Sequence, residues 1–198
     1  AGFVGQDTRA GEFAENSRKE YVAGWRLGQV TNTQDNSGVT LEVHPVTADR
    51  QDVEDALGRF LGDIQQVPPM YSAIKIGGRR AYERLRAGET VELPARRVTI
   101  HRLELLALDA ARHTLLLDVD CSRGTYIRSL VADIGEKLGC GAVMTALRRT
   151  KANGFPIDGC ITLDELAELA QSGKIEEKII PIEQALGSYR FVNVTEPQ

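Results

Sequence analysis

The sequence of 198 residues contains no long apolar run. No segment approaches the roughly 20 consecutive apolar residues that a membrane helix needs, and no basic start followed by an apolar stretch marks a secretion signal. Cysteine is also scarce. Cys121, Cys140 and Cys160 are odd in number and widely spaced, which excludes a disulfide framework and a CxxC zinc site. We therefore expect reduced thiols, no membrane association and a cytoplasmic location.

Motifs for common cofactors are missing too. No P-loop or GxGxxG string follows an expected strand, and neither HExxH nor GxSxG occurs. The histidines, His44, His101 and His113, lack the spacing of metal ligands. These absences predict a protein that works without a metal or an organic cofactor.

Charge is distributed unevenly in a composition that is otherwise typical of globular proteins, with 42% apolar and 26% charged residues. The 37 residues of segment 162–198 hold seven acids and three bases, which accounts for the whole net charge of −4. Segment 75–102 instead carries eight bases and three acids. Local positive charge suits a polyanionic partner, but charge alone does not distinguish such a partner from arginines that solvate helix faces.

The apolar periodicity predicts strands and helices along most of the chain. We expect strands at 20–27, 39–44, 97–108, 113–121 and near 143–150, and helices at 49–61, about 79–88, 125–138 and 162–172. The clearest is helix 125–138, whose apolar face is formed by Ile127, Leu130, Val131, Ile134 and Leu138. Strands 20–27 and 39–44 are expected to form a hairpin. This order favours the α+β class, with a mainly antiparallel mixed sheet and flanking helices.

Two groups of residues have patterns suited to binding anions. Segment 121–130 (CSRGTYIRSL) turns from a strand into a helix that begins with Tyr126 and Arg128. A cation in a first turn opposes the helix dipole, which favours a nearby carboxylate or phosphate, although an arginine that points to solvent is the open alternative. Lys75 and Tyr82 lie among further bases and aromatics, a pattern suited to RNA.

Four segments, in this order along the chain, closely resemble the TruB family of tRNA pseudouridine synthases. They are KEYVAGWRLGQVTNTQDNSG (19–38), VPPMYSAIKIGGRRAYE (67–83), CSRGTYIRSLVADIGEKLGCGA (121–142) and LRRTKANGFPI (147–157). The resemblance implies a partial pseudouridine synthase catalytic domain over 1–186, with an RNA-facing basic hairpin and helix at 75–102. It further implies that 187–198 begins a small RNA-binding tail domain.

The resemblance also implies an activity. The family converts uridine to pseudouridine at position 55 in the T-loop of tRNA, without a cofactor, after flipping the base into a pocket where an aspartate attacks. We accordingly expect a monomer that binds the T-arm of tRNA. Tyr21 would stack on the flipped base and assist proton removal, and Arg128 would pair with the catalytic aspartate. The remaining implied residues are Tyr126 and Leu147 in the pocket, and Lys75, Tyr82, Arg148 and Arg149 facing RNA.

One departure concerns the nucleophile. The family's aspartate lies in a G-x-L-D-P-x-A-x-G motif upstream of the tyrosine that Tyr21 matches, and no such string occurs in these residues. Asp7 stands where the family commonly has alanine, so we expect the nucleophile upstream of Ala1. The alternative is a noncatalytic relative that binds or folds tRNA. The sequence upstream of Ala1 would discriminate the two.

Overall fold

The structure, a computed structural model, describes residues 5–10, 18–72, 74–87 and 93–187. It divides the chain into two compact units. One unit is Arg18–Thr150, and the other combines Ala1–Ser17 with Lys151–Gln198. The predicted site residues lie in the first unit.

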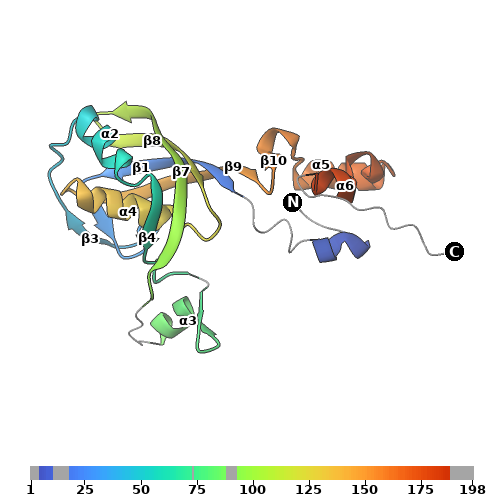
Figure 1. Ribbon diagram of the computed structural model, residues 1–198, viewed down its shortest axis with the longest axis horizontal. Coiled ribbons are helices and arrows are strands. Elements are labelled where there is room, and N and C mark those ends of the chain that lie inside the picture. The colour runs from blue at the N-terminus through green and yellow to red at the C-terminus, as the bar shows by residue number, and fades with distance from the viewer. Residues whose placement is uncertain (1–4, 11–17, 73, 88–92, 188–198) are drawn as a thin grey trace. The chain divides into compact units, whose positions relative to one another are not determined.

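The first unit is built on a sheet in which most neighbouring strands come from distant parts of the chain (Figure 1). Its strand order is β9 (Ala142–Ala152), β1 (Lys19–Leu27), β8 (Thr114–Cys121), β7 (Arg96–Asp109) and β4 (Gly62–Gln66), of which β7 and β8 follow each other directly in the chain. The pairs β1 with β8, β8 with β7, and β7 with β4 are antiparallel. With the helices below, this arrangement confirms the predicted α+β class.

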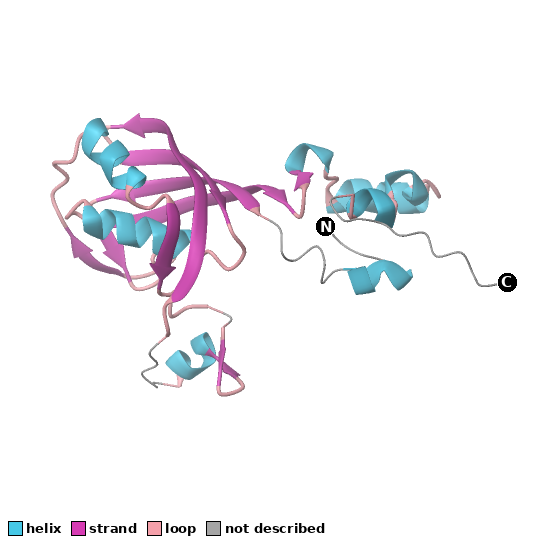
Figure 2. Cartoon of the chain, in the orientation of Figure 1, coloured by secondary structure: helices cyan, strands magenta, loops and turns pink. Residues whose placement is uncertain are grey.

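Two helices pack against this sheet, α2 (Arg50–Gly58) and α4 (Ile127–Lys137) (Figure 2). They contact each other, while α2 also contacts β7 and α4 contacts β1. The predicted apolar face of α4 is confirmed, because Ile127, Leu130, Val131 and Ile134 are buried and Leu138 packs against the core. Each fully buried side chain of this size stabilises the fold by roughly 1.5–3 kcal/mol.

The starts of two helices are determined locally. Asp49 precedes α2, where its carboxylate accepts from the Asp52 N–H at 3.0 Å while the Asp52 carboxylate accepts from the Asp49 N–H at 3.0 Å. Thr162 and Glu165 form the same reciprocal pair before α5 (Leu163–Gln171). Each pair satisfies backbone donors that a helix start leaves unpaired. Both helix starts were predicted from the sequence.

The expected hairpin between 20–27 and 39–44 is wrong. Gly28, at φ +85°, ends β1, and β2 (Gln29–Thr31) pairs instead with β3 (Thr40–Val43) in a separate two-stranded sheet. The burial of side chains on β1 explains this pairing. One face of β1 carries the buried Ala23, Trp25 and Leu27, and β8 supplies a matching apolar face. All four residues of β3 are exposed, so pairing β3 with β1 would place side chains that face solvent beside the buried face of β1.

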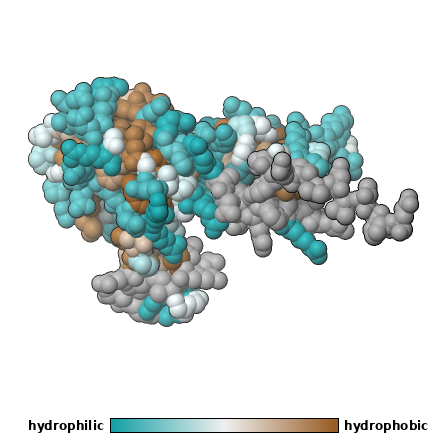
Figure 3. Space-filling model, viewed as in Figure 1, coloured by the Kyte–Doolittle hydropathy of each residue, from teal (hydrophilic) through white to brown (hydrophobic). Residues whose placement is uncertain are grey.

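The chain between β4 and β7 leaves the large sheet, as expected for a basic hairpin and helix. It forms β5 (Lys75–Ile76), β6 (Arg79–Arg80) and α3 (Ala81–Arg86), a helix shorter than predicted. Figure 3 shows that hydrophilic side chains cover most of the visible surface of the first unit, and that apolar side chains gather beside α2, which contacts β7. No helix within the described ranges is long and apolar enough to cross a bilayer.

In the residues of the second unit that the structure describes, the helices and strands are short. They are η1 (Gly5–Ala10), β10 (Phe155–Pro156), η2 (Ile157–Gly159), α5, η3 (Ile175–Lys178) and α6 (Ile182–Ala185). β10 pairs with the end of β9 at Lys151 and Ala152. The tail segment predicted at 187–198 lies, except for Gly187, outside the described residues.

We predict that Gly135→Ala destabilises the protein although alanine is the better helix former. A Cβ at position 135 of α4 would overlap the backbone nitrogen and the Cβ of Ala142 at the start of β9. Overpacking of this kind costs about 1–3 kcal/mol of unfolding free energy, which urea denaturation measures. The control is Gly58→Ala in α2, where a Cβ meets nothing within 4 Å; it should stabilise by up to ~1 kcal/mol.

We also predict a pH-dependent effect of Asp133→Asn. Burial, and next the charge of Glu136, raise the pKa of Asp133 on α4 to about 6, above its ordinary 3.8. The folded state therefore holds this proton more tightly than the unfolded state, and stability is lost as pH rises from about 4 to about 6. At pH 7 the variant should be more stable by about 1 kcal/mol, which allows for solvent screening of a partly exposed carboxyl. Urea unfolding near pH 4 should show no difference.

Candidate functional site

The start of α4 lies beside the loop that joins β2 to β3. The Arg128 guanidinium donates from Nη1 to Asp35 Oδ2 and to the Thr33 carbonyl, both at 3.1 Å, and from Nη2 to the Tyr71 carbonyl at 2.9 Å. The Arg128 side chain is 22% exposed and that of Asp35 is 17% exposed. The anionic partner expected for this first-turn cation is therefore present, as a carboxylate of the protein itself.

Asp35 is oriented by its own loop. Its Oδ1 accepts from Thr33 Oγ1 at 2.7 Å, from the Ser37 N–H at 3.0 Å and from Ser37 Oγ at 2.5 Å, which leaves Oδ2 facing Arg128. Burial pushes the pKa of Asp35 upward, but the hydrogen bonds from Ser37 and Thr33 and the charge of Arg128 outweigh burial, so its pKa lies below the ordinary value. The carboxylate is ionised at neutral pH.

Sequence reasoning missed Asp35 and treated its segment as a turn. The available signal was the spacing of a threonine, an aspartate and a serine at 33, 35 and 37, which is typical of a carboxylate that binds its own backbone. That signal predicts a turn and does not identify the helix opposite. The predicted pairing of Arg128 with an upstream nucleophile stays a prediction.

Tyr126, a predicted pocket residue, caps α4 and is held by a buried amide. The Tyr126 N–H donates to Gln66 Oε1 at 2.8 Å, and Gln66 Nε2 donates to the Tyr126 carbonyl at 3.1 Å. Gln66 is 1% exposed at the end of β4. It links the edge strand to the helix that carries Arg128, and the sequence offered no signal for this role.

Tyr21 lies on β1, partly buried against the core. Burial, and next the charge of Cys121, raise the pKa of its hydroxyl, while the charge and hydrogen bond of Arg149 oppose this rise. The phenol is therefore protonated at neutral pH and lies beside a cation. The structure thus brings together two predicted site residues, Tyr21 and Arg149, from the adjacent strands β1 and β9.

β9 also holds the loop that carries Asp35. The Asn36 N–H donates to the Met144 carbonyl at 3.0 Å, and the Met144 N–H donates to the Gln34 carbonyl at 3.1 Å. Leu147, Arg148 and Arg149 follow on the same strand and are exposed, Leu147 by 45%. The pair Arg128 with Asp35 and the pair Tyr21 with Arg149 are therefore both attached to β9.

The basic segment 75–102 is neutralised in part by the protein. Arg97 pairs with Asp63 at 2.5 Å, and Arg102 pairs with Asp118 at 2.8 Å. Lys75 and Tyr82 lie in β5 and α3, but their side chains, like that of Asp7 in η1, lie outside the described residues. No group of three or more His, Cys, Asp or Glu residues that could hold a metal occurs in the described part of the chain.

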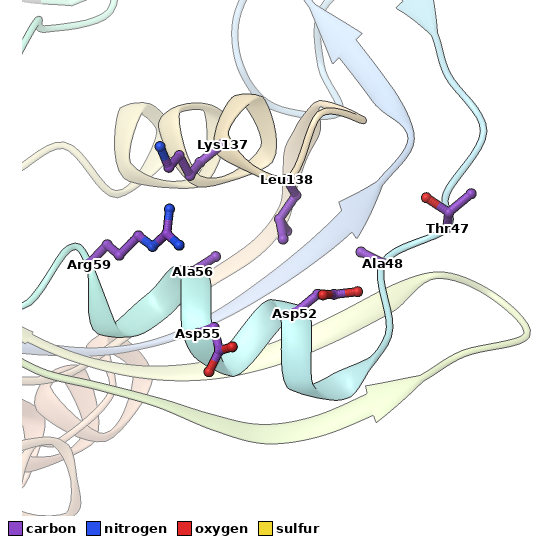
Figure 4. Close-up of a pocket in the computed structure, with 8 residues that line it drawn as sticks. All are labelled: Thr47, Ala48, Asp52, Asp55, Ala56, Arg59, Lys137 and Leu138. Carbon is purple, nitrogen blue, oxygen red and sulfur yellow. The ribbon is translucent and has the colours of Figure 1, made fainter.

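A pocket of about 300 Å³ lies between α2 and the last turn of α4 (Figure 4). Its lining residues are Thr47, Ala48, Asp52, Asp55, Ala56, Arg59, Lys137 and Leu138. The lining carries both signs of charge and includes none of the predicted site residues. Arg128 and Lys137 are nine residues apart on α4, about 14 Å at 1.5 Å per residue, so this pocket is separate from the Arg128 site.

Comparisons with known proteins identify relatives over nearly the whole chain. The chain is 44% identical over 195 residues to the tRNA pseudouridine synthase B of Pseudomonas syringae pv. syringae (strain B728a), a match that covers 97% of this chain and 63% of the relative. It is 47% identical over 172 residues to that of Cupriavidus pinatubonensis (strain JMP 134 / LMG 1197), which covers 86% and 54%. The chain thus spans about 60% of the length of such relatives.

Solved structures share the fold. A chain in a Cbf5-Nop10-Gar1 complex is 28% identical with a TM-score of 0.65, over 90% of this chain and 46% of that chain. A chain in an H/ACA RNP bound to a substrate RNA containing 2'-deoxyuridine has a TM-score of 0.61 at 24% identity, over 90% and 44%; it supports the fold alone.

Family profiles divide the chain between two matches. Residues 2–127 match the N-terminal domain of the TruB family pseudouridylate synthases, and residues 128–187 match the tRNA pseudouridylate synthase B C-terminal domain. The first profile covers more than half of the sequence, and the matched relatives carry the same family name. The resemblance found in the sequence is confirmed, and the chain belongs to the TruB family of pseudouridylate synthases.

Proposed function

We propose that the protein isomerises uridine to pseudouridine at position 55 in the T-loop of tRNA, without a metal or organic cofactor. Family membership supports pseudouridine synthesis, and the relatives are named for tRNA. The observation that carries the proposal is the paired Arg128 and Asp35 at the start of α4, with Tyr21 and Arg149 on the adjoining strands β1 and β9. This arrangement supplies fixed charge and an aromatic ring, which suit a flipped base.

The proposed chemistry balances within the substrate. An aspartate attacks the nucleoside and forms a transient bond to it, and the bond from the ribose to uracil N1 breaks. The bond to the aspartate then breaks as a bond from the ribose to C5 forms, which releases the carboxylate unchanged. C5 loses a proton and N1 gains one, so nothing is oxidised or reduced. We propose that the attacking aspartate belongs to the family's G-x-L-D-P-x-A-x-G motif, which precedes the tyrosine that Tyr21 matches and does not occur in these residues. Asp35 is instead engaged by Arg128, Thr33 and Ser37.

Arg128 and Tyr21 take distinct parts in this scheme. A guanidinium held by Asp35 and two carbonyls keeps its orientation, and its remaining donors are available to an incoming carboxylate. Tyr21 supplies a ring on which the uracil stacks. Its raised pKa keeps the phenol protonated, so a part in proton removal requires that its own proton first leave to another group. Arg148, Leu147, Tyr126, Lys75 and Tyr82 are proposed to contact RNA.

The activity is tested with the full-length gene product and a T-arm stem-loop carrying tritium at uridine C5. Tritium release is expected from the T-loop uridine, and the control stem-loop carries cytidine at that position. Binding is titrated in parallel at two salt concentrations, because phosphate contacts make affinity fall with salt. Salt-sensitive binding without release would instead favour a noncatalytic tRNA-binding protein.

We predict that Arg128→Ala lowers kcat by at least ~100-fold, because it removes a preorganised charge beside the reacting groups. Tritium release under single-turnover conditions measures the loss. Arg59→Ala is the matched control, since Arg59 is the exposed residue that caps the end of α2 and lines the separate pocket; it should leave turnover unchanged. Near-normal turnover in Arg128→Ala would reject this role.

We predict that Tyr21→Ala abolishes turnover while it leaves tRNA affinity largely intact, because one stacking contact is a small part of a phosphate-dominated interface. Filter binding and tritium release measure the two quantities. A fall in affinity as large as the fall in rate would make Tyr21 a docking residue. Tyr21→Phe separates its two proposed parts, since it keeps the ring and removes only the hydroxyl.

A further inference from the structure

The backbone at Gln34 adopts an uncommon conformation directly before Asp35. Its φ is +63°, in the left-handed region that residues with side chains rarely occupy. Glycine would be the usual choice at such a position. A conformation of this kind persists where surrounding contacts hold it, and such positions gather at functional sites.

Three contacts hold Gln34. Its N–H donates to the Thr31 carbonyl at 3.2 Å, and its carbonyl accepts from the Met144 N–H at 3.1 Å. Its side-chain Oε1 accepts from Ser129 Oγ at 3.0 Å. The backbone of Gln34 is therefore held by β2 and β9, and its side chain is held by α4.

Ser129 is suited to this task because it is fully buried, with 0% exposure, and follows Arg128 on α4. A buried hydroxyl needs a hydrogen-bond partner, and Gln34 provides one. Two consecutive helix residues, Arg128 and Ser129, thus bind two consecutive loop residues, Asp35 and Gln34. Arg128 and Asp35 are oppositely charged, whereas Ser129 and Gln34 are neutral.

We propose that Ser129 and Gln34 form a positioning pair that fixes loop 32–38, so that Asp35 holds the Arg128 guanidinium in its working orientation. The pair does not touch substrate and acts through Asp35 and Arg128. The proposal deepens the proposed function and rests on it. If the contact between Ser129 and Gln34 only stabilised the fold, its loss would lower the free energy of unfolding and leave the loop geometry and kcat unchanged.

The kinetic test uses Ser129→Ala and Gln34→Ala in the full-length gene product with the tritiated stem-loop. We expect each variant to lower kcat about tenfold, because small displacements of an oriented group are costly to rate, with KM changed by less than about twofold. The double variant should be no slower than either single variant, since both remove the same contact. Ser129→Thr, which keeps the hydroxyl, should retain at least about half of the rate. Gln51→Ala is the control, because this exposed glutamine of α2 donates to Asp55 of the same helix at 2.9 Å.

The second test does not depend on activity. The amides to follow by hydrogen exchange are those of Asn36 and Met144, which bond between the loop and β9, and that of Gln34, which bonds to Thr31. Their exchange should be at least about tenfold faster in Ser129→Ala than in wild type. Ser129→Thr and Gln51→Ala should leave it unchanged.

Unchanged exchange in Ser129→Ala would overturn the proposal, and so would faster exchange with normal kcat. If the wild-type protein forms no pseudouridine, the proposed function is wrong. The hydrogen-exchange rates then still show whether Ser129 and Gln34 hold the loop.

Discussion

The guanidinium of Arg128 joins three chain segments that are far apart in the sequence: α4, the loop with Thr33 and Asp35, and the segment at Tyr71. A charge that is mostly removed from water is unfavourable unless it is paired and hydrogen-bonded. Asp35 supplies the opposite charge, and two carbonyls bind further N–H groups. The loop and the segment before β5 are therefore organised around one side chain.

The core allows this arrangement because it fixes the helix independently of the site. α4 packs its apolar face on the sheet through Ile127, Leu130 and Ile134. The side-chain amide of Gln66 in β4 forms two hydrogen bonds with the backbone of Tyr126, just before the helix begins. The guanidinium thus projects from an element whose position does not depend on substrate, which suits precise orientation of a reactive group.

The net charge of the chain does not describe the charge around the candidate site. The net charge of −4 is set by the C-terminal segment, whereas the arginines near the sheet divide into two groups. Arg97 and Arg102 are neutralised by Asp63 and Asp118. Arg148 and Arg149 stand exposed on β9, beside the segments that form the site. For the proposed binding of RNA, the distribution of charge matters more than the net charge, because screening limits the reach of each charge to about 10 Å at moderate salt.

The sequence by itself determined the features that depend on near neighbours in the chain. The 3.6-residue periodicity of α4 and the starts of α2 at Asp49 and of α5 at Thr162 all involve residues within a few positions of one another, and the structure confirms them. Family motifs, which are local strings, likewise identified Tyr21 and Arg128 as site residues. Those two roles stay predictions, but the residues were located without any knowledge of the fold.

Only the tertiary structure decided which segments meet. β1 pairs with β8, which is almost 100 residues away in the sequence, because this pairing buries the apolar face of β1. The predicted strand 39–44 pairs with β2 instead. Asp35 and Arg128 are 93 positions apart, and Gln66 and Tyr126 are 60 apart. A carboxylate in a polar turn and a glutamine at a strand end look ordinary in sequence. They become candidate site residues only where the packing of α4 on the sheet brings a cation and a helix start to them.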